Sequence, residues 1–417
     1  MKLAVSEPDT DKIMNSNSPV TDLLDVDPVY NTNLGAAFNG DSRNLLAQLP
    51  DDAIDLVVTS PPFALQHKKE YGNENQGSYN DWFLSFIPEI RRVLQPHGSL
   101  VIEIGGAYKR GFPERSNYQF ELLNRLLDPD EGGMHLAQDF YWYNPAKLPN
   151  PIEWVNIRKI RASDAVTHIW WLSPDINKES AVKEGEHPHP EASNQRVLQD
   201  YSESQQQIFE SGEFNHGKRS SGWNIGSEGF MNENDGSIPD NLLNGAPVES
   251  VLESLDEVSL EDFISQMSGD PIEDLTAGDL LRFLGMGGPI PDNMIEASNT
   301  ASNTHYLKMC RQFGADAHPA RFPRQIPEFF IDFLTPNPPY DDWDHGILDR
   351  PIVLDIFAGS NITGQIAEFK DRYWLAFERE RKYVEISQFR FLTEEEISKR
   401  YDDDQSDFGD FTPLSSD

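Results

Sequence analysis

Two short stretches of the chain hold residues whose types and spacing fit chemistry on a bound ligand. In DLVVTSPPF, at Asp55–Phe63, an apolar run with the composition of a buried strand ends at Ser60 and is followed by two prolines and an aromatic residue. Proline has no N–H and cannot continue a strand ladder, so the carbonyl groups of Ser60 and Pro61 remain as acceptors in a stiff geometry. Beside the Phe63 ring, these acceptors predict a pocket for a planar group with an amino substituent. A proline-ended edge strand is the alternative.

The second stretch, VLDIFAGSNITG at Val353–Gly364, has the composition of a strand, a tight turn and the start of a helix. Backbone N–H groups at such a turn face whatever lies over the strand ends. The next strand ends at Glu378, 23 positions after Asp355, and a carboxylate at about this spacing can accept hydrogen bonds from both hydroxyl groups of a ribose. The patterns of phosphate-binding loops and dinucleotide turns are both missing from the stretch, so an adenosyl ligand without a phosphate chain fits better. An ordinary glycine turn is the alternative.

Strand and helix patterns alternate around both stretches. Apolar strands and amphipathic helices alternate from Ala36 to about Leu100, and two further strands are predicted in AQDFYWYNP and DAVTHIWWLSP. After Arg350 the pattern is strand, glycine turn, helix, strand and helix. This alternation predicts an α/β fold with a mostly parallel sheet and helices on both faces. Ligands bind at the carboxyl ends of the strands in such sheets, so we expect the two stretches to share one cleft.

Composition and charge limit the classes of protein that the chain can belong to. The 34 basic and 70 acidic residues give a net charge of −36, and the stretch Gly245–Arg282 alone holds ten acidic residues and one basic residue. Such an excess suits a salt-rich cytoplasm, and we interpret it as a halophilic feature. With no long apolar run and no signal-peptide core, we expect a soluble, cytoplasmic protein without a membrane partner. A single cysteine, Cys310, excludes an intrachain disulfide and a zinc site built from several cysteines, and no metal site is expected. We expect Cys310 to lie on a helix, where its side chain fills space in the packing.

The chain resembles the S-adenosylmethionine-dependent amino-methyltransferases of DNA in two motifs. These are S-P-P-[YF] after one strand and F-x-G-S-N-x-T-G after another. The order of an early catalytic stretch, a variable middle and a late cofactor stretch is similar to that of their beta class. The resemblance covers about 36–172 and 306–391. It implies a Rossmann-like methyltransferase sheet of seven strands with a less regular target-recognition region.

The resemblance also implies roles for individual residues. The catalytic residues are Ser60, Pro61, Pro62 and Phe63. Asp41 in NGDS corresponds to an acid near the cofactor adenine, and HPARFP resembles the segment that lines the methionine end. The residues expected to bind S-adenosylmethionine are therefore Asp41, Asp355, Phe357, Ala358, Gly359, Ser360, Asn361, Thr363, Glu378, His318 and Phe322.

Serine at position 60 points to the acceptor base. In this family serine usually goes with cytosine N4, whereas Asp or Asn usually goes with adenine N6. The implied function is therefore site-specific methylation of cytosine N4 in duplex DNA, by base flipping and direct in-line transfer, with adenine N6 as the alternative. Phe63 replaces the commoner tyrosine, which keeps the stacking surface but removes a hydroxyl group. Methylation at carbon 5 is disfavoured, because Cys310 follows Met309 instead of proline.

Despite the net charge, local basic clusters could contact the phosphates of DNA, and ordinary solvated surface is the alternative for each cluster. The residues that we expect to bind DNA are Lys109, Arg110, Arg158, Arg161, Lys218, Arg219 and Trp223. A cognate restriction endonuclease is a further expected partner, as in a restriction–modification system, and the chain is expected to act as a monomer or homodimer.

The resemblance divides the chain into segments of different character. These are a flexible N-terminal arm (1–30), a catalytic half of the methyltransferase domain (31–175), a target-recognition region (176–300) with an acidic helical insertion (about 245–286), a cofactor-binding half (301–396) and an acidic tail (397–417). The insertion has no counterpart in the family.

Two other functions fit parts of the sequence. A second proline pair, NPPY at Asn337–Tyr340, resembles the catalytic stretch of methyltransferases that act on other amides or amines, such as a protein glutamine or an RNA base. Its upstream segment is predicted to be helical, and the cofactor turn follows it along the chain, in contrast to those enzymes, so we interpret it as a turn. A decayed nucleic-acid-binding protein is the other possibility, and the intact Ser60, Gly359 and Glu378 argue against it.

Overall fold

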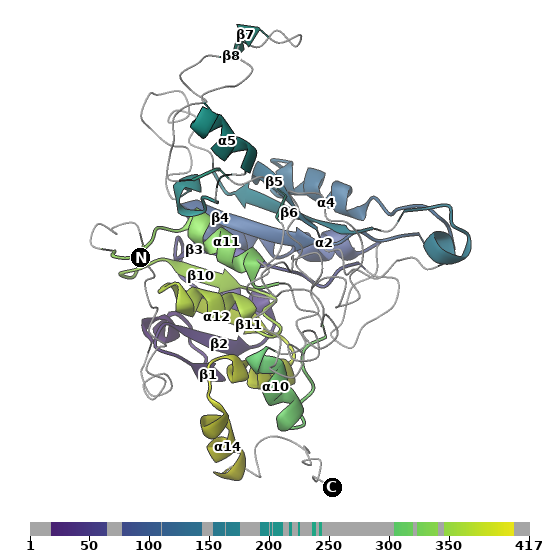
Figure 1. Ribbon diagram of the computed structural model, residues 1–417. Coiled ribbons are helices and arrows are strands. Elements are labelled where there is room, and N and C mark those ends of the chain that lie inside the picture. Colours follow the sequence, from purple (N-terminus) through teal and green to yellow (C-terminus); the bar gives the residue numbers. More distant parts are fainter. Residues whose placement is uncertain are drawn as a thin grey trace, which may run out of the picture.

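The computed structural model (Figure 1) describes most of the chain outside its termini and its acidic middle. The described residues are 18–64, 77–109, 111–143, 153–162, 164–175, 192–199, 201, 203–211, 217–218, 224–225, 236–238, 242–243, 304–319, 323–340 and 346–403. The acidic insertion predicted at about 245–286 lies outside these residues, as do Arg110, Arg219, Trp223 and Phe322.

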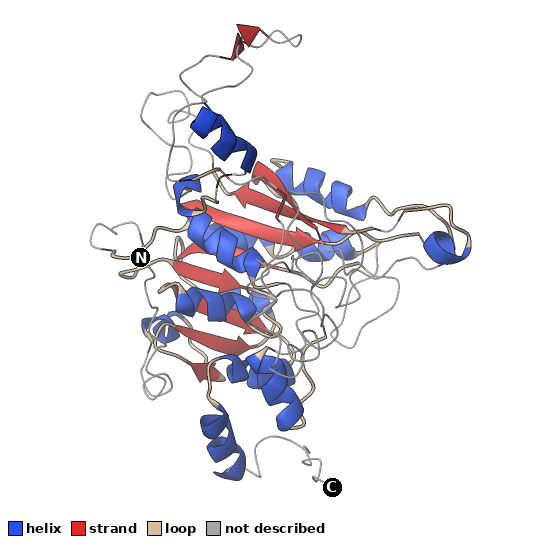
Figure 2. Ribbon diagram, viewed as in Figure 1, coloured by secondary structure: helices blue, strands red, loops and turns tan. Residues whose placement is uncertain are grey.

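A sheet of nine strands forms the centre of the described part of the chain (Figures 1 and 2). In spatial order the strands are β1 (Tyr30–Asn31), β2 (Gly35–Asn39), β11 (Tyr373–Glu378), β10 (Ile352–Asp355), β3 (Ile54–Thr59), β4 (Leu94–Ile104), β6 (Val166–Ser173), β5 (His135–Tyr143) and β9 (Leu242–Leu243). From β2 to β4 the strands are parallel, whereas β6 is antiparallel to both β4 and β5. Seven longer strands therefore confirm the predicted sheet, and a two-residue strand extends it at each edge.

The two halves of the strand-and-helix pattern, which are far apart along the chain, join inside this sheet. Strand β10 lies between β11 and β3, and Val353 is paired with Leu56 although the two residues are far apart along the chain. Parallel pairing brings the carboxyl ends of β3 and β10 to the same edge. The residues that follow these two strands are the two stretches singled out in the sequence.

Helices cover both faces of the sheet, as Figure 2 shows. On one face the core contains side chains from α1 (Ser42–Leu46), α2 (Tyr79–Leu84), α3 (Ile87–Val93) and α4 (Tyr118–Leu127). The opposite face packs against α11 (Gln325–Leu334), α12 (Ile362–Phe369) and α13 (Arg381–Ser387). Neighbouring strand residues separate accordingly: Leu354 belongs to the first core and Val353 to the second, because successive side chains of a strand point to opposite faces.

A smaller apolar cluster lies beside the sheet. It joins α10 (His305–Gln312), the 3-10 helix η6 (Gln388–Arg390) and α14 (Glu394–Asp403). Cys310 is 2% exposed within this cluster, which confirms its expected packing role.

Two of the predicted segment boundaries are wrong. Residues 18–30 do not form part of a loose arm, because the 3-10 helix η2 (Pro19–Leu23) buries Val20 in the main core. Helix α14 crosses the expected boundary at residue 396, and Ile397 is 1% exposed. In both places a few apolar residues in a polar sequence are enough to hold the segment against the fold.

The second proline pair is a loop after α11, as interpreted from the sequence. The buried Arg372 donates from Nη2 to Asn337 Oδ1 at 2.8 Å, and the Tyr340 hydroxyl donates to the Asp371 carbonyl at 2.9 Å. These bonds fix the loop at the amino end of β11, away from the carboxyl ends of the strands.

The described part of the segment 176–300, where a target-recognition region is expected, contains few elements. They are the 3-10 helix η4 (Asn194–Arg196), helix α5 (Glu203–Ser211), strands β7 (Gly217–Lys218) and β8 (Asn224–Ile225), and strand β9 at the sheet edge. Helix η4 packs on α11, where Arg196 Nε donates to the Asp332 carbonyl at 2.6 Å.

Within the described ranges, no helix combines the length and apolar character that crossing a bilayer requires. The same residues contain no group of three or more His, Cys, Asp or Glu side chains arranged to hold a metal ion.

Candidate active site

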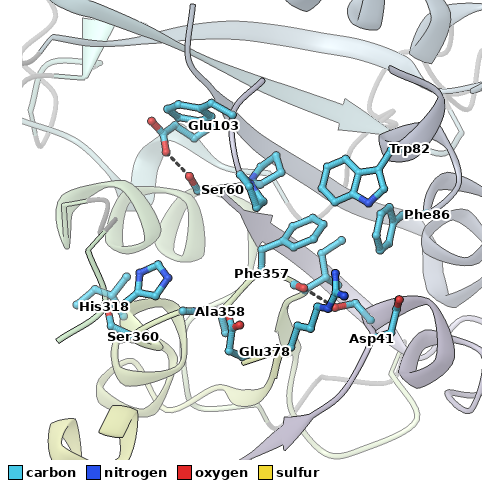
Figure 3. Close-up of a pocket in the computed structure, with 18 of the residues that line it drawn as sticks. Asp41, Ser60, Trp82, Phe86, Glu103, His318, Phe357, Ala358, Ser360 and Glu378 are labelled. Carbon is cyan, nitrogen blue, oxygen red and sulfur yellow. Dashed lines mark hydrogen bonds between the residues drawn. The ribbon is translucent and has the colours of Figure 1, made fainter. Parts of the chain in front are cut away.

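A pocket of about 220 Å³ lies at the carboxyl ends of β3, β10 and β11 (Figure 3). Residues 60–63 line it from the first half of the fold. Residues 356–360, Glu378 and His318 line it from the second half. The sheet therefore brings the serine–proline stretch and the glycine turn to one cavity, as the sequence predicted.

Ser60 and Glu103 form a hydrogen-bonded pair in this pocket. The Ser60 hydroxyl donates to Glu103 Oε2 at 2.6 Å, and Glu103 is 3% exposed. Their proximity follows from strand register: Thr59 is paired with Ile102, so the residues that follow each come side by side. Because the Ser60 proton is directed at Glu103, the lone pairs of Ser60 Oγ stay available to accept from a ligand.

Glu103 was not identified from the sequence. Its signal was a lone carboxylate in the otherwise apolar run SLVIEIGG. Such a residue is nearly always paired when it is buried, but the sequence does not show which partner it has.

Phe63 packs against bare backbone. A Cβ atom at Gly105 would come within 2.4 Å of Phe63 Cε2, so the ring occupies the space that a side chain at Gly105 would need. The Tyr118 hydroxyl donates to the Gly105 carbonyl and holds this backbone in place. Glycine directly after β4 therefore sets the position of the Phe63 ring.

Asp355 lies beneath the glycine turn and does not line the pocket. Its carboxylate is 1% exposed and accepts from Thr59 Oγ1 at 2.8 Å, from the Phe357 N–H at 3.0 Å and from Thr363 Oγ1 at 2.8 Å. Burial raises the pKa of Asp355 to about 6, and the hydrogen bonds oppose this shift. Asp355 and Thr363, expected to bind the cofactor, are placed here to join β3, β10 and α12.

The turn itself presents Gly359 and Glu378 to the pocket. Gly359 has φ +51°, and a Cβ atom there would lie 3.0 Å from His318 Cε1. The Gly359 N–H donates to Glu378 Oε2 at 2.9 Å, and the Glu380 N–H donates to Oε1 at 2.8 Å. Burial raises the pKa of Glu378. Each carboxylate oxygen makes one of these bonds and has a further lone pair for a ligand hydroxyl.

Arg390 and Asn361 support the turn from behind. Arg390 donates to both the carbonyl and the hydroxyl of Ser360, the latter at 2.9 Å, and lies over the Tyr306 ring at 4.4 Å. Asn361, at φ +55°, caps α12 by accepting from the Gly364 N–H at 3.0 Å. Arg390 was not identified from the sequence, where it is one basic residue among many.

Asp41 lines the pocket from the start of α1. It caps α1 and forms an ion pair with Arg43 at 2.5 Å, and the hydrogen bond from Arg43 lowers the pKa of Asp41. The Ser42 hydroxyl donates to the Ile356 carbonyl at 2.6 Å, which joins the start of α1 to the end of β10.

An aromatic wall lines the pocket beside the glycine turn (Figure 3). The Phe357 ring centre lies 5.5 Å from that of Trp82 and 5.2 Å from that of Phe86. Trp82, Phe86 and, from β5, Trp142 were not singled out in the sequence, because apolar residues at helix or strand spacing are typical of any core.

The residues expected to bind DNA are described only in part. Lys109 pairs with Glu114 at 2.7 Å, Arg158 pairs with Glu153 at 2.7 Å, and Arg161 lies over the Tyr108 ring at 4.5 Å. None of the three lines the pocket. Lys218 lies in β7, but its side chain is outside the described part of the structure.

Comparison with known proteins supports the same chemistry. Residues 54–389 match the N6_N4_Mtase family, described as DNA methylase. The chain belongs to this family. Among curated members, the type II methyltransferase M.PvuII of Proteus hauseri is 40% identical over 380 residues, which are 90% of each chain. The type II methyltransferase M.BamHI of Bacillus amyloliquefaciens is 35% identical over 109 residues, 25% of this chain and 24% of that protein.

A solved structure of a DNA methylase agrees with the architecture. The PvuII DNA methyltransferase, titled cytosine-N4-specific, is 36% identical and covers 90% of this chain and 94% of its own, with a TM-score of 0.57. The similarity therefore extends over both halves of the pocket.

Proposed function

We propose that this DNA methylase transfers a methyl group from S-adenosylmethionine to the exocyclic N4 amino group of cytosine in duplex DNA. The observation that carries the proposal is the Ser60 hydroxyl bound to the buried Glu103, in a pocket shared with Gly359 and Glu378. The 40% identity to M.PvuII and the likeness to a structure titled cytosine-N4-specific support cytosine over adenine.

The lower part of the pocket fits S-adenosylmethionine. Glu378 accepts from the ribose hydroxyl groups, because two backbone N–H groups already fix the direction of its carboxylate. Gly359 leaves its backbone bare beneath His318, where a Cβ atom would fill the space. Asp41 faces the adenine, and His318 lines the methionine end. Phe322, to which the resemblance gives the same role, lies outside the described residues. When bound, S-adenosylmethionine supplies an electrophilic methyl group on a positively charged sulfur.

The upper part of the pocket fits a cytosine that has left the duplex. An amino nitrogen cannot be reached inside the base stack, so the target nucleotide is extruded. Phe63 stacks on the extruded ring, and the Ser60 hydroxyl and the Pro61 carbonyl accept the two N–H groups of N4. These two acceptors favour a tetrahedral nitrogen with its lone pair directed into the shared cavity, so the residues act chiefly by positioning.

Glu103 makes the Ser60 hydroxyl an acceptor for the amino group of the substrate. Its carboxylate keeps the Ser60 proton turned away from the substrate, which leaves Ser60 Oγ free to accept. The proton that N4 loses on methylation passes to Ser60 Oγ while the Ser60 proton passes to Glu103 Oε2, so the hydroxyl is regenerated. The chain then needs no covalent intermediate.

The proposal is tested by sequencing that reports modified bases in DNA from a host that expresses the protein. We expect N4-methylcytosine at one recurring short sequence, absent from a host that carries the Ser60→Ala variant. N6-methyladenine in its place would overturn the assignment of the acceptor base. A decayed DNA-binding protein would leave the DNA unmodified and would not bind S-adenosylmethionine in calorimetry.

The partners and location follow from the same proposal. The substrate is duplex DNA in the cytoplasm, and the type II names of the relatives favour a cognate restriction endonuclease as a partner in function. Such an endonuclease would cut plasmid from a host without the methyltransferase and leave plasmid from the expressing host intact. The chain acts as a monomer or homodimer, which sedimentation would distinguish.

A further inference from the structure

Three large apolar side chains are exposed in two loops near the pocket edge of the sheet. Phe112 is 58% exposed, Ile157 65% and Ile160 61%. Phe112 lies in the loop between β4 and α4, whereas the isoleucines lie in the segment Glu153–Arg161, which contains the short π-helix η3 (Glu153–Ile157) and connects β5 to β6. We call Glu153–Arg161 the tip. Figure 1 shows η3 projecting beyond the sheet.

The tip leaves the sheet at the same edge as the catalytic residues. Strand β5 ends at Tyr143 and β6 begins at Val166, and β6 is antiparallel to β4. The carboxyl end of β4, next to Glu103, therefore lies at the edge from which the tip extends. A duplex that delivers a base to Ser60 must pass across this edge.

The tip is basic in a strongly acidic protein. It holds Arg158, Lys159 and Arg161 against Glu153, a net charge of +2 from three basic residues and one acidic residue, while the whole chain carries −36. This local charge suits DNA phosphates, which bind Lys and Arg.

The tip is also held in a defined conformation. The Arg158 N–H donates to the Glu153 carbonyl at 2.8 Å and the Ile160 N–H to the Trp154 carbonyl at 2.9 Å, while Arg158 lies over the Trp154 ring at 5.0 Å. Lys159 between the two isoleucines has φ +56°, a conformation that costs free energy for a residue with a side chain.

The neighbouring loop braces the tip. Arg161 Nη1 donates to the Pro113 carbonyl at 2.8 Å, next to the exposed Phe112, and its guanidinium lies over Tyr108. The Tyr108 hydroxyl in turn donates to Asp164, which follows the tip along the chain. A braced segment that exposes two isoleucines is arranged to present them to a partner.

We infer that the tip is a DNA wedge: Ile157 and Ile160 insert into the base stack beside the extruded cytosine, and Lys159, which lies between them, contacts a flanking phosphate. Apolar side chains that enter a duplex part the base steps, and they stabilise a duplex from which a base has been removed. This inference rests on the proposed function, because a wedge is useful to an enzyme that extrudes its target base.

The test uses the full chain with Ile157 and Ile160 both changed to alanine. The matched control is Ile347→Ala, because Ile347 is 43% exposed and precedes the amino end of β10, at the opposite edge of the sheet. Binding is measured by fluorescence anisotropy on two duplexes that contain the methylated sequence. One is fully paired, and the other has an abasic site opposite the target cytosine, which makes extrusion easier.

We expect the double variant to bind the paired duplex about tenfold more weakly, a change of about 1.4 kcal/mol, and the abasic duplex within about threefold of wild type. Calorimetry should show unchanged affinity for S-adenosylmethionine. Lys159→Ala should reduce the slope of log affinity against log salt by about one.

Wild-type affinity on both duplexes, or an equal loss on both, would overturn the wedge. A dimer in the wild type and a monomer in the double variant, seen by sedimentation with unchanged DNA affinity, would assign the tip to a second copy of the chain instead. Failure of the proposed function gives a different result, since wild-type protein would then leave no N4-methylcytosine whatever the tip contributes to binding.

Discussion

The Ser60 hydroxyl lies between a buried carboxylate and an open pocket, and this position decides what the residue can do. Ser60 Oγ donates its proton to Glu103 Oε2, with 2.6 Å between the two oxygens, so Ser60 Oγ can act only as an acceptor toward the open pocket. A second buried carboxylate, Asp355, does not line the pocket. It accepts three hydrogen bonds, which join the end of β3, the turn after β10 and the start of α12. Two buried acids at one sheet edge therefore have separate roles.

Glu103→Gln should lower kcat by about 10² to 10⁴ fold, since glutamine can no longer take up the Ser60 proton. The affinity for S-adenosylmethionine, measured by calorimetry, should stay within about twofold, because Glu103 lies at the Ser60 end of the pocket (Figure 3). Glu114→Gln, an exposed carboxylate on the next loop, is the matched control. Wild-type kcat in Glu103→Gln would contradict the role of the pair.

Asp355 should make the protein less stable as pH rises through its folded pKa. Burial raises this pKa from 3.8 to about 6, so the folded state holds the proton more tightly than the unfolded state does. The resulting stability is present below pH 4 and is lost between about pH 4 and 6, by about 3 kcal/mol. Denaturant unfolding should show the stability of wild type falling relative to Asp355→Asn across this window. A constant difference between the two proteins would contradict the shift.

At the scale of elements, the site depends on where strands end. Residues after β3, β4, β10 and β11 meet because these strands are parallel neighbours, and the turn after β10 needs the left-handed conformation of Gly359. Short segments of the chain therefore supply each half of the pocket, and strand order brings the halves together.

Gly359→Ala should weaken S-adenosylmethionine binding by about tenfold and lower the free energy of unfolding by about 1–2 kcal/mol. The substituted residue would hold a left-handed conformation with its Cβ against His318. Gly77→Ala is the control, because its Cβ would meet nothing within 4 Å. Calorimetry and urea unfolding measure the two effects, and equal behaviour of the two variants would show that the turn tolerates a side chain.

The sequence predicts the parts of the site that are contiguous along the chain, but not the contacts made between distant strands. The Ser60 stretch and the Gly359 turn are each contiguous, so residue types and spacing were enough to find them. Glu103 was missed because its partner is set by the register between β3 and β4, which no local pattern states. Asp355 was expected to bind the cofactor because it lies in the glycine-turn motif. Its place beneath the turn depends on a hydrogen bond from Thr59 in a distant strand, which the motif does not show.

At the scale of the whole molecule, a net charge of −36 must coexist with binding to a polyanion. The tip carries a local positive charge, whereas acidic residues outnumber basic residues in the chain as a whole and repel one another. Salt therefore acts in two directions, by relieving repulsion in the folded chain and by weakening contacts with phosphates.

The melting temperature should rise by several degrees between about 0.1 and 1 M KCl, because the screening length falls from about 10 to 3 Å. DNA affinity should fall over the same range. Differential scanning calorimetry measures the first effect, with an equal osmolality of sucrose as the control. A melting temperature that is independent of KCl would contradict the halophilic interpretation of the charge.

The most direct test of the shared pocket is mass spectrometry of nucleosides from duplex DNA incubated with the protein and S-adenosylmethionine. Wild-type protein should produce N4-methylcytosine, and both Ser60→Ala, from the first half of the fold, and Glu378→Gln, from the second, should lower the yield by about 10² fold or more at limiting S-adenosylmethionine. N6-methyladenine as the product, or an undiminished yield from Ser60→Ala, would contradict the account.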